Sequence, residues 1–224
     1  DIMAWLINKP AKIVSSMGSL RYYTEKNAPP GSGTRCVECG VKNDCPYDAE
    51  KFYMDKINAG NTGWPTNILA TEPTKDKVYG AVKNGPYGRC VYRCDNNVVD
   101  HQIVNIEFDG ETTAHLTMTA FSERQGRKIH IHGEKGEIYG NTEDNKLYCI
   151  VFGKSQKVID IAIMNDNNFG HGGGDFWLVN DIVNTYNGGG SKELTSIENS
   201  MLSHKIGYAA EKSRLCGGKL VCIN

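Results

Sequence analysis

The sequence contains no long apolar segment and no excess of either charge. No apolar run approaches the roughly 20 residues that a membrane-spanning helix needs. The 224 residues include 25 basic and 26 acidic side chains, for a formal net charge of -1. We therefore expect neither a nucleic-acid partner nor a membrane partner. No cationic segment followed by an apolar one opens the chain, so we see no secretory signal and expect a cytoplasmic protein.

Several well-known functional motifs are also missing. The sequence has no G-x-x-x-x-G-K-[ST] phosphate loop and no G-x-G-x-x-G turn after a predicted strand. It has no serine-centred nucleophile elbow. These absences exclude the usual nucleotide-binding and serine-hydrolase machinery from these residues.

The composition is that of an ordinary globular protein, with 39% hydrophobic and 23% charged residues. The length allows a proper core. Residue 1 is Asp, and residues 1–7 already have a helical pattern. Because natural chains seldom begin within a helix, we expect this sequence to be a piece of a longer protein.

The order of predicted elements indicates an α+β fold. Short β-rich segments joined by tight turns favour a large, mostly antiparallel sheet with helices on one face. Asp109-Gly110 is a strong hairpin signal between two of the strands. We expect strands at 12–24, 98–108, 112–121, 127–132, 136–139, 146–152, 157–163 and 219–223, and helices at 46–57, 174–186 and 196–215.

The strand at 98–108 is not purely polar on either face. One face carries Val104, Ile106 and Phe108, whereas the other mixes Ile103 with polar side chains. A sheet that is apolar on both faces must be covered on both. We therefore expect a homodimer built sheet against sheet, the alternative being a second face that is merely mixed.

Eight cysteines are present, and three of them form the compact pattern Cys36-x2-Cys39-x5-Cys45. A C-x2-C pair brings two sulfurs within reach of one tetrahedral ion, so the loop predicts a structural zinc site. The fourth ligand is not obvious, because Cys90 or Cys94 would have to fold back to reach it. Free thiols and a disulfide within the loop are the alternatives.

Two of the six histidines, His130 and His132, share one face of a predicted strand. That spacing can hold a metal, but no carboxylate or third histidine lies at an obvious partner spacing. We therefore interpret them as surface or packed side chains.

A glycine run stands directly before the helix at 174–186. Gly172, Gly173 and Gly174 let backbone approach a ligand closely, and the helix start offers free N–H groups. His171 and Asp175 bracket the run with two proton-active groups. The alternative is a surface loop with an Asp that caps the helix.

These segments together resemble the Gfo/Idh/MocA oxidoreductase family, in order and spacing over nearly the whole chain. Segments 87–92, 95–102 and 127–138 are similar to the family's sheet, 172–175 to its late glycine-Asp segment, 196–204 with 209–214 to its closing helix, and the Cys36/Cys39/Cys45 loop to an insertion in one branch.

The resemblance implies an NAD(P)-dependent dehydrogenase of two domains. Family members bind NAD or NADP on an N-terminal Rossmann domain and transfer hydride to or from a sugar, inositol or related polyol. Their C-terminal domain, of the glyceraldehyde-3-phosphate dehydrogenase type, forms one wall of the substrate site, and its sheet commonly makes the dimer interface. Residues 1–224 resemble that second domain only, as a single domain without the Rossmann part.

The resemblance also implies site residues. The family's catalytic His lies in an H-x-x-D motif on the helix entering this domain, and Asp1 matches the Asp of that motif. Asp1 would then orient a His three residues before this sequence begins, while His171 and Asp175 would contact substrate hydroxyls. Two other functions stay open: a non-catalytic interaction and dimerisation module, and a zinc-dependent enzyme that uses the cysteine loop.

Overall fold

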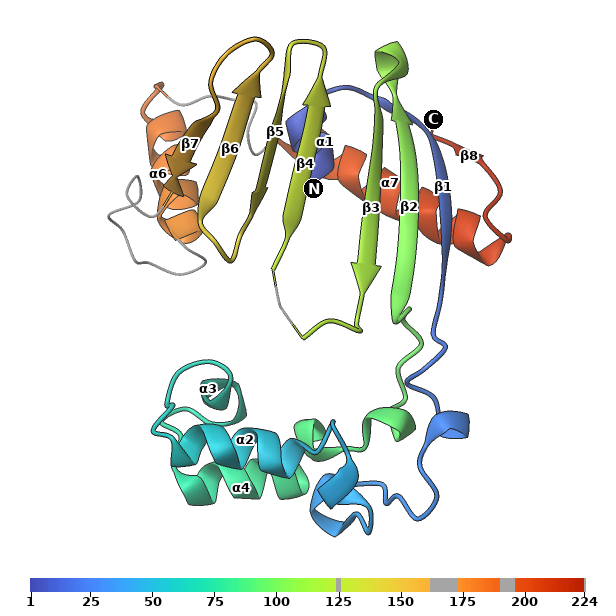
Figure 1. Ribbon diagram of the computed structural model, residues 1–224, viewed down its shortest axis with the longest axis vertical. Helices are drawn as coiled ribbons and strands as arrows, with labels where there is room; N and C mark the ends of the chain where they lie inside the picture. The colour runs from blue at the N-terminus through green and yellow to red at the C-terminus, as the bar shows by residue number, and fades with distance from the viewer. Residues whose placement is uncertain (124–125, 162–172, 190–195, 224) are drawn as a thin grey trace.

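The computed structural model describes residues 1–123, 126–161, 173–189 and 196–223. Its strands lie side by side in the upper part of Figure 1, and a separate group of helices lies below them. We call this lower group, residues 20–100, the helical lobe. The lobe is inserted between the first and second strands. Its two ends therefore leave and re-enter the sheet at the same end of these paired strands.

The strands form two antiparallel four-stranded sheets. The first sheet has the order β3-β2-β1-β8, and the second has the order β4-β5-β6-β7. The predicted α+β class with antiparallel strands is confirmed, although the strands are divided between two sheets. Their bounds are β1 Ala11–Ser19, β2 His101–Phe108, β3 Thr113–Thr119, β4 Lys128–Gly133, β5 Gly136–Asn141, β6 Lys146–Val151, β7 Lys157–Asp160 and β8 Val221–Cys222.

The hairpin between β2 and β3 forms at the predicted Asp109-Gly110 turn. Gly110 has a φ of 69°, a left-handed conformation that glycine adopts without steric cost. β2 and β3 are then paired in register from His101 opposite Thr119 to Glu107 opposite Thr113. The turn chemistry therefore fixes which β2 side chains face the helices.

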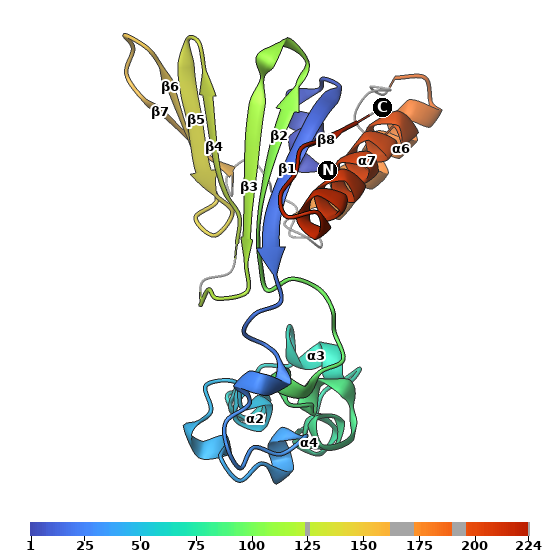
Figure 2. The same cartoon turned by 90° about the vertical axis from the view of Figure 1, so that its right-hand side faces the viewer.

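Helices cover one face of the first sheet. Figure 2 shows α7 (Ile197–Leu215) lying across this face, and α1 (Ile2–Ile7) packs against α7. Val104, Ile106 and Phe108 point into the core from β2, and α7 contributes two small residues that allow close approach. The buried core consists of Ala4, Ala11, Val14, Val104, Ile106, Phe108, Ile206, Ala209 and Ala210.

Ser213 joins α7 to the sheet and to the end of the chain. It is completely buried, donates a hydrogen bond to the Lys219 carbonyl (2.6 Å) and accepts one from the Ser16 N–H (2.9 Å). Each partner would otherwise be a buried backbone group without a bond. The hydroxyl therefore fixes the spacing between helix and strand.

The opposite face of the first sheet is mixed. Met17 and Ile103 are partners across β1 and β2 and are 64% and 49% exposed. Asn105 and His115, which are partners on the same face, are polar. Exposed apolar area is thus concentrated at one pair and does not extend over the whole face.

The helical lobe has a small core of its own. It is built from α2 (Ala49–Asn58), α3 (Thr66–Leu69) and α4 (Lys75–Asn84), with Val78 and Val82 completely buried on α4. The other helices are α6 (Gly174–Tyr186) and the short 3-10 segments η1 Glu25–Asn27, η2 Cys36–Glu38, η3 Lys42–Asp44, η4 Pro86–Gly88, η5 Val91–Arg93 and η6 Asp109–Glu111.

The predicted helices at 46–57, 174–186 and 196–215 correspond to α2, α6 and α7 and are confirmed. The pattern did not predict α3 or α4. Within the described part of the chain, no helix is long and apolar enough to cross a membrane.

Candidate functional site

A buried carboxylate lies where the first sheet meets the helical lobe. Asp100, directly before β2, is 2% exposed. Its Oδ2 accepts hydrogen bonds from the N–H groups of Arg21 (2.9 Å), Tyr22 (2.6 Å) and Tyr23 (3.4 Å). Its Oδ1 lies 2.7 Å from Nδ1 of His101. One side chain therefore orders both the start of the lobe and the neighbouring imidazole.

These contacts set the charge of Asp100 and the tautomer of His101. Burial by itself would raise the pKa of Asp100, but the hydrogen bonds from Tyr22, His101, Arg21 and Tyr23 outweigh it and lower the pKa to about 2. An ionised carboxylate only accepts hydrogen bonds, so Nδ1 of His101 must be the donor. The other ring nitrogen, Nε2, is left for a partner outside this pair.

His101 borders a broad, open hollow of about 850 Å³. Its side chain is 43% exposed. The hollow combines two cations, a histidine and two aromatic rings, which suits a polar ligand with an apolar face. Its lining residues are Arg21, Tyr22, Lys26, Asn27, His101 and Phe121.

An aromatic cluster, mostly from the helical lobe, borders this hollow. It consists of Tyr22, Tyr23, Tyr47, Tyr92 and Phe121, whose neighbouring ring centroids lie 5.3–6.3 Å apart. The Tyr92 hydroxyl also donates to the Tyr22 hydroxyl at 3.1 Å. Since Tyr47 and Tyr92 also line the cysteine cavity described next, the two sites share a wall.

The three cysteines of the predicted zinc loop line one small cavity of about 20 Å³, and Cys90 lines it as well. Burial, followed by the Asp48 carboxylate and the Cys90 and Cys45 thiols, raises the pKa of the Cys36 thiol. The Gly33 N–H donates to the Cys39 sulfur at 3.4 Å. The four thiols line one cavity, but among the described residues no three of their sulfurs lie within 4.8 Å of one another. A tetrahedral ion would therefore require these side chains to move together.

Cys90 thus does fold back towards the loop. It directly precedes the 3-10 segment η5 and does not lie on a strand, and its N–H donates to the Thr34 carbonyl at 2.9 Å. All eight cysteines lie in the described residues, and none forms a disulfide. The alternative of a disulfide within the loop is therefore wrong.

The other predicted site residues lie elsewhere. Asp1 directly precedes α1, and its carboxylate accepts a hydrogen bond from the Ser203 hydroxyl of α7. Asp175 lies in the first turn of α6 and is exposed, and Gly173 before it has a φ of 90°. His171 lies outside the described residues.

Sequence reasoning missed the Asp100–His101 pair. The available signal was an acidic residue directly before a histidine at the start of a strand. That signal does not reveal that Asp100 is buried, because the N–H groups that hold it come from residues 21–23.

The chain is similar to known oxidoreductases, although no family model matches it. The curated protein "Putative oxidoreductase YteT" of Bacillus subtilis strain 168 is 23% identical, covering 81% of this chain and 44% of its own length. An oxidoreductase domain protein from Kribbella flavida has a TM-score of 0.58 and 14% identity, covering 100% of this chain and 49% of its own.

Two other solved structures are more distant. A Thermotoga maritima protein, also provisionally described as an oxidoreductase, has a TM-score of 0.50 and 12% identity, covering 99% of this chain and 43% of its own. A levoglucosan dehydrogenase solved with NADH and levoglucosan has 17% identity and a TM-score of 0.47, covering 56% of this chain and 39% of its own. That similarity is too low to assign its ligands here.

The chain spans less than half the length of each of these proteins. The Bacillus relative supplies a sequence relationship, and the Kribbella structure supplies the shared fold over the whole chain. Together they confirm the predicted resemblance at the level of an oxidoreductase relative and a shared oxidoreductase-domain fold.

Proposed function

We propose that this chain is the substrate-side domain of an NAD(P)-dependent oxidoreductase that transfers hydride to or from a sugar, inositol or related polyol. The observation that carries the proposal is the Asp100–His101 pair, which orients an imidazole over an open, cation-lined hollow on an oxidoreductase fold. In this proposal residues 1–224 form one domain of a longer cytoplasmic protein. The eight free cysteines support a reducing compartment.

The nicotinamide cofactor belongs to another domain in this proposal. A dinucleotide pyrophosphate is held by a glycine-rich turn that connects a parallel strand to a helix. Both described sheets are antiparallel, so this part of the chain does not fit that group. The cofactor supplies the hydride chemistry, and the residues here bind and orient the substrate.

His101 acts on a substrate hydroxyl through Nε2. Asp100 holds the ring from the other side. Arg21 and Lys26 supply charge-assisted hydrogen bonds to hydroxyl or carboxylate oxygens, and the Phe121 ring offers an apolar surface to a sugar face.

The family resemblance implies further site residues. Asp1 orients a catalytic His that precedes this sequence, and His171 and Asp175 contact further hydroxyls. The Cys36, Cys39 and Cys45 thiols, joined by Cys90, hold a structural zinc ion.

Substituting His101 with Gln in the full-length enzyme tests this function. We expect kcat/KM towards the best substrate in a panel of sugars, inositols and polyols to fall up to roughly 10-fold, because the hydrogen bond between Nε2 of His101 and a substrate hydroxyl is lost. His204→Gln, at an exposed position on α7, is the matched control. An unchanged kcat/KM for His101→Gln would rule out a role in substrate binding.

We further propose that the chain forms a homodimer through the mixed face of the first sheet. The exposed Met17–Ile103 pair supports this, because burying it would remove apolar surface from water. We expect light scattering to give twice the chain mass at micromolar concentration, and Ile103→Lys to give a monomer. A monomeric wild-type protein would contradict the proposal.

A further inference from the structure

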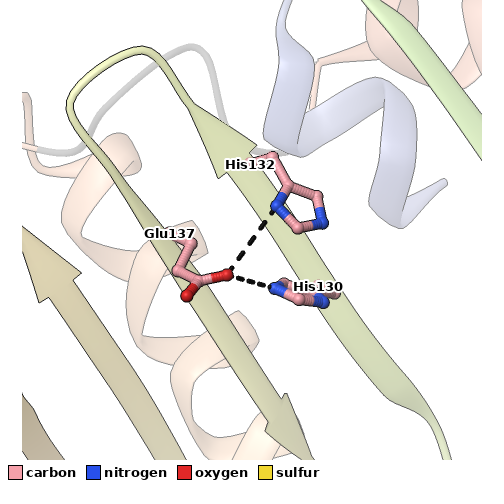
Figure 3. Close-up of side chains that lie close together, drawn as sticks. All are labelled: His130, His132 and Glu137. Atoms are coloured by element: carbon pink, nitrogen blue, oxygen red, sulfur yellow. Dashed lines mark hydrogen bonds and ion pairs between the residues drawn. The ribbon is translucent and has the colours of Figure 1, made fainter. Parts of the chain in front are cut away.

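The hairpin of β4 and β5 brings together two histidines and a glutamate. His130 and His132 are two residues apart on β4 and therefore share one face of the strand. The antiparallel register places Glu137 of β5 directly opposite His132 and next to His130 on that face. Figure 3 shows the three side chains pointing towards one another from the two strands.

Their donor atoms lie close enough to share one ion. The Nε2 atom of His130 is 2.7 Å from Oε2 of Glu137, and Nδ1 of His132 is 3.7 Å from the same oxygen. One donor atom from each residue lies within 4.8 Å of the other two. In tetrahedral zinc sites with bonds of about 2.0–2.1 Å, donor atoms are about 3.3 Å apart. The observed separations lie on either side of that value, so small side-chain rotations suffice.

A single hydrogen bond explains only part of this arrangement. The hydrogen bond between His130 and Glu137 explains why these two side chains lie close together. It leaves His132 beyond hydrogen-bond distance of the carboxylate, with its ring centroid 3.9 Å from that of His130. A cation between the three groups would bring both imidazole nitrogens and the carboxylate oxygen into use.

Neighbouring rings hold the histidine in place. Tyr139, opposite His130 across the hairpin, packs edge-on against it at 5.6 Å, and it stacks on Tyr148 of β6 at 4.9 Å. Packing of this kind limits the orientations of a ligand side chain, which metal sites require. The site therefore sits on paired strands and not on a loop.

We propose that His130, His132 and Glu137 bind a first-row divalent transition-metal cation. Two imidazoles and one carboxylate suit Zn²⁺ and its neighbours, whereas Mg²⁺ and Ca²⁺ prefer sites made of oxygen alone. The His132 side chain is 72% exposed and that of His130 is 49% exposed. Solvent access leaves coordination positions open for water or an external ligand.

This site is separate from the cysteine cavity, which lies in the helical lobe. The test must therefore distinguish two classes of zinc. Untagged protein is saturated with Zn²⁺ and dialysed, so that tightly held zinc is retained. Calorimetry then follows the binding of added Zn²⁺, and NMR follows the histidine ring resonances.

We expect one further equivalent to bind with a micromolar dissociation constant and to shift the rings of His130 and His132. His130→Gln, His132→Gln and Glu137→Gln should each weaken this binding at least ~10-fold, and the double histidine variant should abolish it. His204→Gln, at an exposed position on α7, is the control and should change nothing. Absence of this equivalent, or binding that survives the double variant or Glu137→Gln unweakened, would overturn the assignment.

Discussion

Replacing Asp100 with alanine is expected to lower the free energy of unfolding by about 3 kcal/mol. The substitution leaves the N–H groups of Arg21, Tyr22 and Tyr23 without their buried acceptor, and each unsatisfied buried group costs about 1–3 kcal/mol, partly relieved by water. The melting temperature of a chain of this size should fall by roughly 6–12 °C. Chemical denaturation and calorimetry measure the two quantities.

Asp95→Ala provides the matched control. The Asp95 side chain is 86% exposed and pairs with Arg89 at the surface, so its loss should cost less than about 1 kcal/mol. Equal effects of the two substitutions would show that Asp100 does not fix the junction between sheet and lobe.

The Asp100 carboxylate also predicts how the free energy of unfolding changes at acidic pH. The pKa of Asp100 is lowered from 3.8 to about 2 in the folded chain. A lowered folded-state pKa means that the stabilisation is complete above about pH 4 and is lost as the pH falls towards 2. Asp100→Ala should therefore flatten the stability curve between these two pH values.

Removing zinc from the cysteine cavity is expected to unfold the helical lobe. The lobe has a small core, centred on Val78 and Val82, and the free energy of binding a structural zinc ion is largely free energy of folding. The chain prepared with zinc should retain one tightly bound equivalent. A strong chelator should then reduce the helical circular dichroism and open residues 20–100 to proteolysis.

Single cysteine variants identify the ligands. Cys90→Ser should release the zinc, because Cys90 lines the cavity with the three loop cysteines. Cys94→Ser is the matched control, since Cys94 lies one turn away and bonds the Cys90 carbonyl. Full zinc retention by Cys90→Ser would remove it from the ligand set. Zinc that leaves without loss of fold would favour a catalytic site over a structural one.

Local chemistry predicted the elements well. α7 begins after Ser196, whose hydroxyl accepts the Asn199 N–H, and it ends before a glycine pair. The β2–β3 hairpin follows from a two-residue turn signal. By contrast, α4 was not predicted, although Thr74 caps its first turn and Val78 and Val82 lie four residues apart on one face.

Pairings between distant residues were not predictable in the same way. Nothing in the strand sequences shows that they divide into two sheets, since that depends on which edges meet. Glu137 is seven residues from His130, and only the hairpin register brings it opposite the histidines. Cys90 reaches the Cys36/Cys39/Cys45 loop because the backbone of residues 34–35 bonds to that of residues 89–90.

Ser19 pairs directly with His101, so the helical lobe is an insertion that leaves and rejoins the sheet at neighbouring residues. Its two attachment points are adjacent, so the entropy of closing the loop depends only weakly on how many residues lie between them. A change in the length of this segment should therefore leave the strand alignment unchanged. A change inside the helical lobe would reshape one wall of the hollow beside His101, while the first sheet keeps its pairing.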